Sequence, residues 1–285
     1  MKQLLRFANL IALAAGGIGM LLMLWLYAGG TDDRGLFPAK HPGWILLLIF
    51  TAVMVAVFFL LTRQVGSSNN YRSNFPASWL GALGCLAGGV GLLIASVDAF
   101  QINSRVTTVE NPMLGIIVGV LGAVGGALLF WAAWCRRQGH KSMVPPHILP
   151  SFFFALRLFL LGQTLGAEPE MQRYLFSFLA NLSLLPACYW LWSFDVNMGR
   201  RPHCLFWCLT AAYCNMVAAI GSNLWIMHLC LAAWLLTNLP RLKYLPKKQR
   251  PAPVETTEAP AVTEVQDVEA TLEQIISEYG SNADT

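Results

Sequence analysis

Charged residues are scarce in this sequence: Asp, Glu, Lys and Arg make up 12% of its 285 positions. Soluble domains carry about 25% charged residues and about 45–50% apolar ones. Hydrophobic residues here reach 56%. A surface facing water on all sides cannot be built from so few charges, so the composition excludes the ordinary soluble class.

Motifs for chemistry are also absent. The sequence contains no HExxH, GxSxG or GxxxxGK[ST] pattern, and no paired carboxylates within an apolar run. The seven cysteines all lie in or at the edges of apolar runs. Cys204 and Cys208 share a helix face without a third ligand, which favours a packing role. We therefore expect no catalytic residue, no metal site and no cofactor, and an intramembrane enzyme is the less favoured alternative.

What the sequence does contain is a series of apolar runs, each close to the length that crosses a hydrocarbon core of about 30 Å. Their lack of period-two alternation favours helices over barrel strands. The predicted fold class is an all-α membrane protein, a bundle of about eight transmembrane helices. The predicted spans are residues 5–28, 44–62, 76–97, 112–134, 148–165, 172–194, 204–220 and 223–239.

The distribution of Lys and Arg predicts the orientation of these spans. Fourteen of the nineteen basic residues fall in segments on the side of the N-terminus, and four fall on the opposite side. Because cytoplasmic loops are enriched in Lys and Arg, both termini are expected in the cytoplasm. The first run is longer than the apolar part of a cleaved signal peptide, so we expect it to be retained as a helix.

Glycine is concentrated in the first four spans, which hold most of the small-xxx-small spacings. Such spacings let helix backbones approach closely. Packing within one bundle and a face for homo-oligomer formation both fit this pattern. The spacings are Ala12/Gly16, Ala15/Gly19, Gly84/Gly88, Gly115/Gly119 and Gly122/Gly126.

Arg157 is the one basic residue inside a span, in the stretch SFFFALRLFLLGQ. A charge at a helix centre costs about 2.5–3.5 kcal/mol on insertion scales, so Arg157 needs a partner. Asn181, Asn215 and His228 are expected at nearly the same depth in the neighbouring spans. Asp98 and Asp195 are interpreted as hydrated caps at span ends.

Two interpretations of this polar belt remain open. In the first, Arg157 donates to backbone carbonyls and to Asn181, while Asn215 and His228 bond each other and hold the helices together. In the second, Arg157, Asn181, Asn215 and His228 line a cavity that binds an anionic ligand.

The segment after the last span differs in character from the bundle. Residues 241–262 begin with a basic cluster expected to attract anionic lipid, at Arg241, Lys243, Lys247, Lys248 and Arg250. The rest of that segment is rich in Pro, Thr and Glu and is predicted to be a disordered linker. Residues 263–280 predict a short amphipathic helix that binds a cytoplasmic protein. Its apolar stripe is Val265, Val268, Leu272, Ile275, Ile276 and Tyr279.

Residues 157–201 carry a resemblance. RLFLLGQTLGAEPEMQRYLFSFLANLSLLPACYWLWSF, followed by NMGRR, resembles uncharacterised multi-spanning membrane proteins of gut Firmicutes. The shared features are an Arg-bearing span, a P-x-x-x-x-Y loop (Pro169 to Tyr174) and a basic turn. The resemblance implies a bacterial cytoplasmic membrane and no particular activity.

Together these features predict a non-enzymatic membrane anchor or scaffold that recruits a cytoplasmic partner through residues 263–280. The alternative is a small transporter or ligand-binding membrane protein that uses the belt around Arg157. The lipid bilayer is the expected surrounding of either, and no nucleic-acid partner is expected.

Overall fold

The structure is a computed structural model of the whole chain. It describes residues 7–29, 41–105, 112–142, 145–165 and 171–240. These residues form α-helices and contain no β-strand, as the sequence predicts. The basic cluster, the linker and the predicted helix 263–280 lie outside the described residues.

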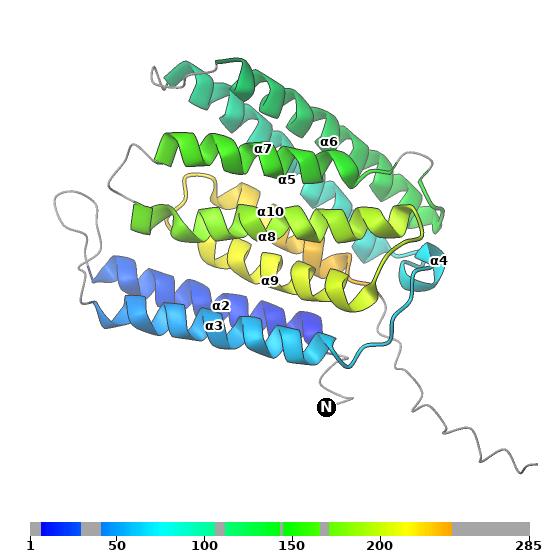
Figure 1. Ribbon diagram of the computed structural model, residues 1–285, viewed down its shortest axis with the longest axis horizontal. Coiled ribbons are helices and arrows are strands. Elements are labelled where there is room, and N and C mark those ends of the chain that lie inside the picture. The colour runs from blue at the N-terminus through cyan, green and yellow to red at the C-terminus, as the bar shows by residue number, and fades with distance from the viewer. Residues whose placement is uncertain (1–6, 30–40, 106–111, 143–144, 166–170, 241–285) are drawn as a thin grey trace, which may run out of the picture. The chain divides into compact units, whose positions relative to one another are not determined.

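Each of the eight apolar runs coincides with a long helix (Figure 1). A four-residue helix that the sequence did not predict, α4, lies between the second and third of them. The bounds are α2 Ala8–Ala28, α3 Pro42–Thr62, α4 Tyr71–Asn74, α5 Trp79–Arg105, α6 Pro112–Gln138, α7 Ile148–Leu165, α8 Met171–Asp195, α9 Arg201–Ala219 and α10 Trp225–Thr237.

Five helices of the described residues are long and apolar enough to cross a membrane: α2, α3, α5, α6 and α8. The described chain is therefore all-helical, with the long apolar helices that are typical of a membrane protein. Of the remaining long helices, α7 and α10 are apolar but shorter, and α9 is less apolar. These three helices carry Arg157, Asn215 and His228.

Successive long helices run in opposite directions, which gives the bundle two distinct ends. The α4 end, defined by α4, also holds the starts of α2, α5, α7 and α9 (Figure 1). The hairpin end, defined by residues 220–224, holds the turn that joins α9 to α10. Gly221 has φ +80° in that turn, a conformation that glycine adopts readily. The connection between α9 and α10 is therefore a tight turn.

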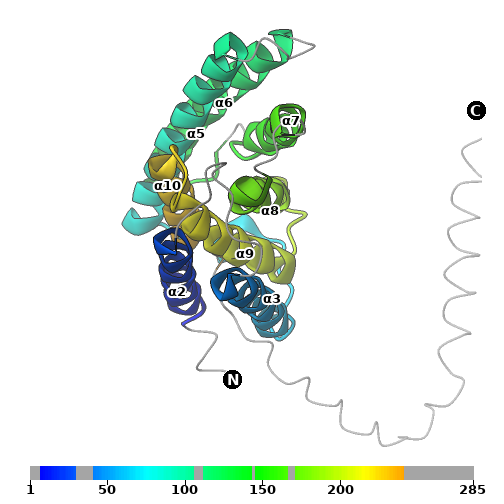
Figure 2. The same ribbon diagram turned by 90° about the vertical axis from the view of Figure 1, so that its left-hand side faces the viewer.

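Helix α9 occupies the centre of the bundle. It packs against α8 and α10 on one side and against α2 and α3 on the other (Figure 2). Most of its residues are buried, including Thr210, Tyr213 and Asn215. Because neighbouring helices shield α9 from the surroundings, it can carry polar side chains that a lipid-facing helix could not.

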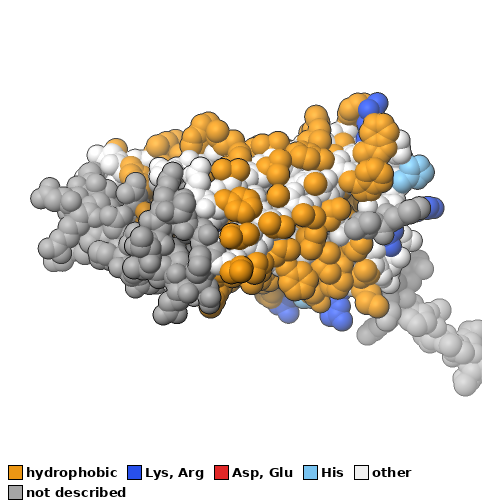
Figure 3. Space-filling model, turned by 90° about the horizontal axis from the view of Figure 1, so that it is seen from above, with side chains coloured by type: hydrophobic (Ala, Val, Ile, Leu, Met, Phe, Trp, Pro, Cys, Tyr) orange, Lys and Arg blue, Asp and Glu red, His pale blue; other side chains and the backbone are white. Residues whose placement is uncertain are grey.

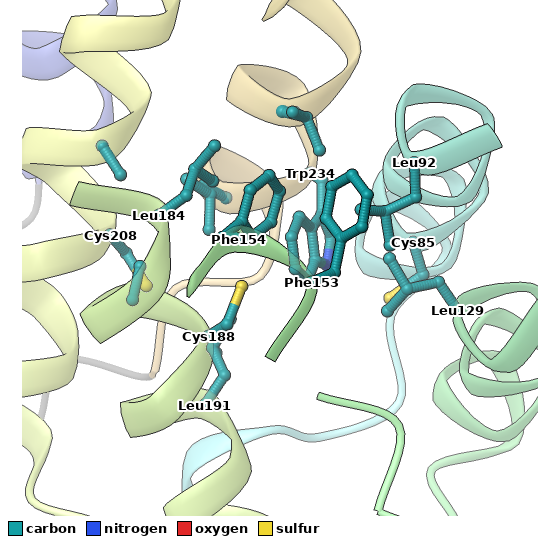
Figure 4. Close-up of a cluster of buried hydrophobic side chains, with 14 of the residues drawn as sticks. Cys85, Leu92, Leu129, Phe153, Phe154, Leu184, Cys188, Leu191, Cys208 and Trp234 are labelled. Carbon is teal, nitrogen blue, oxygen red and sulfur yellow. The ribbon is translucent and has the colours of Figure 1, made fainter. Parts of the chain in front are cut away.

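The larger core cluster lies between α5, α6, α7, α8, α9 and α10. Phe153 and Phe154 of α7 project between Leu184 and Cys188 of α8 and Leu92 of α5 (Figure 4). The two Phe rings contact each other edge to face, with centroids 5.0 Å apart. A second core cluster joins α2 and α3 to α9 and to the first half of α8. Arg157 comes one turn after Phe153 on α7, so the first core holds its backbone in place.

The small residues pack within the bundle. A Cβ added at Gly88 would meet the Trp234 side chain of α10, and one at Gly122 would meet Phe153. Gly16 lies against Met216 of α9 in the same way. These contacts account for the glycine spacing by packing inside one chain, which was one of its two interpretations.

The surface of the bundle is largely apolar. Hydrophobic side chains cover the middle of the face in Figure 3, and the Lys and Arg side chains visible there lie in the right-hand half of the view. Among the basic residues whose exposure the structure describes, the exposed or half-exposed ones lie at the α4 end: Arg63, Arg72, Arg137, Lys141 and Arg200. This separation is the pattern of a protein that sits in a bilayer with one basic side.

Candidate functional site

A group of polar side chains lies inside the hairpin-end half of the bundle. We call it the Arg157 cluster, and each member comes from a different helix. The members are Asp98 of α5, Arg157 of α7, Asn181 of α8, Asn215 of α9 and His228 of α10.

Arg157 is 3% exposed and is held by α5 rather than by α8. Its Nη1 donates to the carbonyl oxygen of Ala95 at 2.9 Å. Its Nη2 donates to Oδ2 of Asp98 at 2.8 Å, which forms an ion pair. The prediction of backbone carbonyl acceptors is confirmed, whereas Asn181 is not the partner that the structure shows.

The interpretation of Asp98 as a hydrated cap was wrong. The predicted span ended at residue 97, but α5 continues to Arg105, so Asp98 lies two turns inside the helix. Its side chain is 23% exposed and binds a buried guanidinium. A charge inside a bundle needs a counter-charge. Because α5 extends past residue 97, Asp98 is part of the helix and supplies that counter-charge to Arg157.

Asn215 and His228 bond each other across α9 and α10. Nδ2 of Asn215 donates to the carbonyl of Ala211, so its Oδ1 is the acceptor that faces the imidazole. His228 Nδ1 lies 2.9 Å from this oxygen. Nδ1 therefore carries the proton, and when the ring is neutral Nε2 presents a lone pair. This bond agrees with the first interpretation of the belt.

Asn181 and Arg157 each retain a buried atom that has no hydrogen-bond partner among the described residues. Nδ2 of Asn181 donates to the Ser177 carbonyl at 2.7 Å, which leaves Oδ1 without a donor. The Arg157 Nε lacks an acceptor. An unsatisfied buried polar atom costs about 1–3 kcal/mol, so both atoms require an explanation.

The two unsatisfied atoms lie at similar depth. The Ser151 hydroxyl donates to the Leu185 carbonyl, which sets the register between α7 and α8. Six residues further along both antiparallel helices, about 9 Å, Arg157 is level with Leu179. Asn181 is then within one helical turn of Arg157 in depth.

Asn215 and His228 lie at the same depth as Arg157 and Asn181. Ser183 of α8 interacts with Cys214 of α9, which brings Asn181 close to the depth of Asn215. Asn215 bonds His228 directly, and an electrostatic interaction links His228 with the Arg157 guanidinium. The structure thus brings the four predicted residues to one depth, and it adds Asp98.

A groove opens beside Asp98, with a volume of ≈ 340 Å³. One wall of the groove is the part of α5 that follows Gly91, the last glycine in contact with α10. The other wall is Leu224, which precedes α10. The lining residues are Leu93, Ile94, Val97, Asp98, Gln101 and Leu224.

The α4 end holds a second set of buried polar contacts. Arg136 donates from Nη1 to the Pro76 carbonyl at 2.6 Å and from Nε to Asn238 Oδ1 at 3.3 Å. Arg201 donates to Asn74 Oδ1 at 2.6 Å. Because Pro76 and Asn74 lie between α3 and α5, these two arginines fasten that connection to the helix ends. The sequence predicts only the side of the membrane on which these two arginines lie. The structure shows that both also have hydrogen-bond partners.

Asp195 belongs to this second set. It is 6% exposed, and its Oδ2 lies 2.8 Å from Nδ1 of His147. The interpretation of Asp195 as a hydrated cap was therefore wrong as well. The His147 ring stacks on Trp234 with the ring planes 5° apart. A small cavity of ≈ 20 Å³ beside it, room for about one water molecule, is lined by Tyr71, Phe75, Cys85, Ala132, Arg136, His147, Leu191 and Asn238.

Cys204 and Cys208 lie side by side on α9, with their sulfur atoms 3.9 Å apart and both side chains buried. Nowhere in the described part of the chain do three or more His, Cys, Asp or Glu side chains gather in a way that could hold a metal ion. His203 stacks against Trp190, with ring centroids 4.9 Å apart.

Comparisons with protein-family models, with curated proteins and with solved structures find no match to this chain. The resemblance of residues 157–201 to membrane proteins of gut Firmicutes stays a prediction.

Proposed function

We propose that the chain is a multi-pass membrane protein of the small-transporter or ligand-binding type, with its ligand in the Arg157 cluster. The observation that supports this proposal is a complementary pair of unsatisfied atoms: the Arg157 Nε is a donor and the Asn181 Oδ1 is an acceptor. A single hydroxyl group can accept from the first and donate to the second.

The charges of the cluster favour a neutral ligand over an anion. The guanidinium of Arg157 is already compensated by the Asp98 carboxylate. Asn181, Asn215 and a neutral His228 add no charge. In the low dielectric of a bundle interior, a second anion beside Asp98 would be repelled. The anionic ligand of the sequence-based interpretation is thus replaced, in this proposal, by a neutral hydroxyl-bearing one.

A ligand screen on the purified full chain tests the proposal. Small polyols and sugars would be compared with phosphate, sulfate and dicarboxylates at matched osmolality and ionic strength. We expect a saturable rise in Tm with at least one neutral compound. Asn181→Leu should abolish the rise, whereas Asn69→Leu, which changes an exposed asparagine, should retain it. Stabilisation by anions alone, or by none of the compounds, would contradict the proposal.

We also propose that all eight long helices cross a bacterial cytoplasmic membrane, with the α4 end and both termini in the cytoplasm. The gathering of exposed Arg and Lys at the α4 end supports this orientation. Cysteines introduced at Arg137 and at Asn223 can be probed in intact cells with an impermeant maleimide. Labelling of Asn223→Cys without permeabilisation, and of Arg137→Cys only after it, is the expected result. The reverse pattern would overturn the orientation.

A second candidate function is the anchor or scaffold that recruits a cytoplasmic protein through residues 263–280. The apolar stripe from Val265 to Tyr279 on an otherwise acidic segment supports it. Crosslinking and capture of the tagged protein, with and without residues 263–280, tests it, and the same proteins from both samples would refute it. A scaffold would tolerate Arg157→Leu, whereas a transporter would not. Binding of anionic lipid by the basic cluster 241–250, and homo-oligomer formation, stay proposals of the same kind.

A further inference from the structure

The groove beside Asp98 has a clear structural cause. Gly84, Gly88 and Gly91 let α5 approach α10 closely, because added Cβ atoms there would meet Thr237, Trp234 and Leu231. Beyond Gly91, α5 contains no further glycine. The two helices therefore leave a groove towards the hairpin end, which Leu224 closes on the α10 side.

The groove changes polarity along its length. Leu93, Ile94 and Val97 form its deeper part, and Asp98 and Gln101 form its end nearest the hairpin. Leu93 to Gln101 covers about 12 Å of helix. The groove is also open at its side, since Val97 is 55% exposed.

This polarity change falls at the depth of the membrane boundary. Trp79 begins α5 and is 63% exposed, as expected for an aromatic residue at the membrane interface. A hydrocarbon thickness of about 30 Å measured from Trp79 corresponds to about 20 residues and reaches Asp98. Asp98 and Gln101 therefore lie at headgroup level, with apolar walls at acyl-chain level.

The charge at the headgroup level selects the ligand. The Asp98 side chain faces the groove with 23% of its surface exposed, and it accepts hydrogen bonds. Its counter-ion, Arg157, is 3% exposed and cannot reach an anionic group in the groove. A headgroup with N–H donors would bind the carboxylate, whereas a purely anionic headgroup would be repelled.

We propose that this groove is a binding site for a membrane lipid with a primary ammonium headgroup, such as phosphatidylethanolamine. The ammonium binds Asp98, and an acyl chain lies along Leu93, Ile94 and Val97. The inference goes beyond the proposed function, because it concerns a lipid in an open groove and not the ligand at the buried unsatisfied atoms.

Lipid titration of the full chain in a neutral detergent, read by native mass spectrometry, tests this site. The probes are phosphatidylethanolamine, its mono- and dimethyl derivatives, phosphatidylcholine and phosphatidylglycerol, all with the same acyl chains. We expect phosphatidylethanolamine to bind about tenfold more tightly than phosphatidylcholine, as expected for one charge-assisted hydrogen bond. Affinity should fall stepwise as N–H groups are replaced by methyl groups.

A matched pair of variants locates the site. Val97→Trp places a bulky ring in the groove without changing the Asp98–Arg157 pair. Val90→Trp adds the same ring at an exposed position of α5 outside the groove. We expect Val97→Trp to lose the headgroup preference and Val90→Trp to keep it, with unchanged helix content in both. Equal binding of all headgroups by the unmodified chain, or an unchanged preference in Val97→Trp, would overturn the inference. Either result would leave the ligand screen on Asn181 unaffected.

Discussion

The carboxylate of Asp98 and the guanidinium of Arg157 meet at 2.8 Å between α5 and α7, and they differ in their access to water. Asp98 is 23% exposed on its side chain, whereas Arg157 is 3% exposed. If its partner is removed, Asp98 can recruit solvent at the groove. Arg157 has no such access. The energetic effect of the two single substitutions should therefore be unequal.

We expect Asp98→Asn to lower the free energy of unfolding by about 3 kcal/mol or more, because a buried charge loses its partner. Arg157→Leu should cost less, and the double variant should be more stable than Asp98→Asn alone. Unfolding in mixed detergent micelles measures all three, with the exposed Arg200→Leu as the control. Additive losses, or a larger loss for Arg157→Leu, would contradict this account.

The Asn215–His228 bond predicts that a single substitution costs more stability than the double substitution. Asn215→Leu leaves the His228 Nδ1–H buried without an acceptor, which costs about 1–3 kcal/mol. Replacing both residues by Leu removes donor and acceptor together, so most of that stability should return. The same unfolding assay checks this, with Asn69→Leu as the neutral control. A double variant that is less stable than Asn215→Leu would argue that the bond is not what holds α9 to α10 at this point.

Two Gly→Ala substitutions add the same methyl group in different surroundings, so their effects on stability can be compared directly. Gly88→Ala places a methyl group against Trp234, whereas Gly17→Ala meets nothing within 4 Å. Overpacking typically costs about 1–3 kcal/mol, and Ala favours a helix by up to about 1 kcal/mol over Gly. The Tm of Gly88→Ala should therefore fall, and that of Gly17→Ala should hold or rise. Equal shifts would mean that the α5–α10 contact is looser than the structure shows.

Tyr71 of α4, outside the membrane-spanning helices, predicts an alkaline pH dependence. Burial raises the pKa of its phenol well above its ordinary value of about 10, and the nearby Arg136 offsets only part of this. The unfolded chain releases this proton more easily than the folded one. Stability should therefore fall as the pH rises above about 10. Tyr71→Phe should flatten that slope in unfolding measurements between pH 8 and 11, and an unchanged slope would exclude Tyr71 as its source.

The helices could be predicted from the sequence because each apolar run has to cover a membrane-sized length. Their ends were less predictable. Apolarity fades before α5 ends, since its last turns carry Asp98, Gln101 and Arg105. The four-residue α4 has no apolar run at all. It is preceded by Asn70, whose side chain accepts from the Arg72 amide and caps the helix, and a search for long apolar runs does not detect such a local cap.

The depth of the site residues in the bundle could be predicted from the sequence, but their hydrogen-bond partners could not. Counting residues along each run brought Asn181, Asn215 and His228 to the level of Arg157. Depth does not tell which neighbour a long side chain will reach, and Arg157 extends to α5 rather than to the adjacent Asn181. The charged group closest to the groove, Asp98, was missed because its position was judged from the end of an apolar run.

The central place of α9 has a consequence for biosynthesis. Helices α2 and α3 meet the rest of the bundle chiefly through α9, which is also the least apolar long helix. A ribosome makes the chain from its N-terminus, so α2, α3 and α5 to α8 are in place before α9 emerges. The Asp98–Arg157 pair can therefore form early, while α2 and α3 wait for the helix that joins them to the other half. A nascent chain arrested before Arg201 would hold two halves that meet only through weaker contacts such as Trp44 with Phe176, and such a chain is a natural target for membrane quality control.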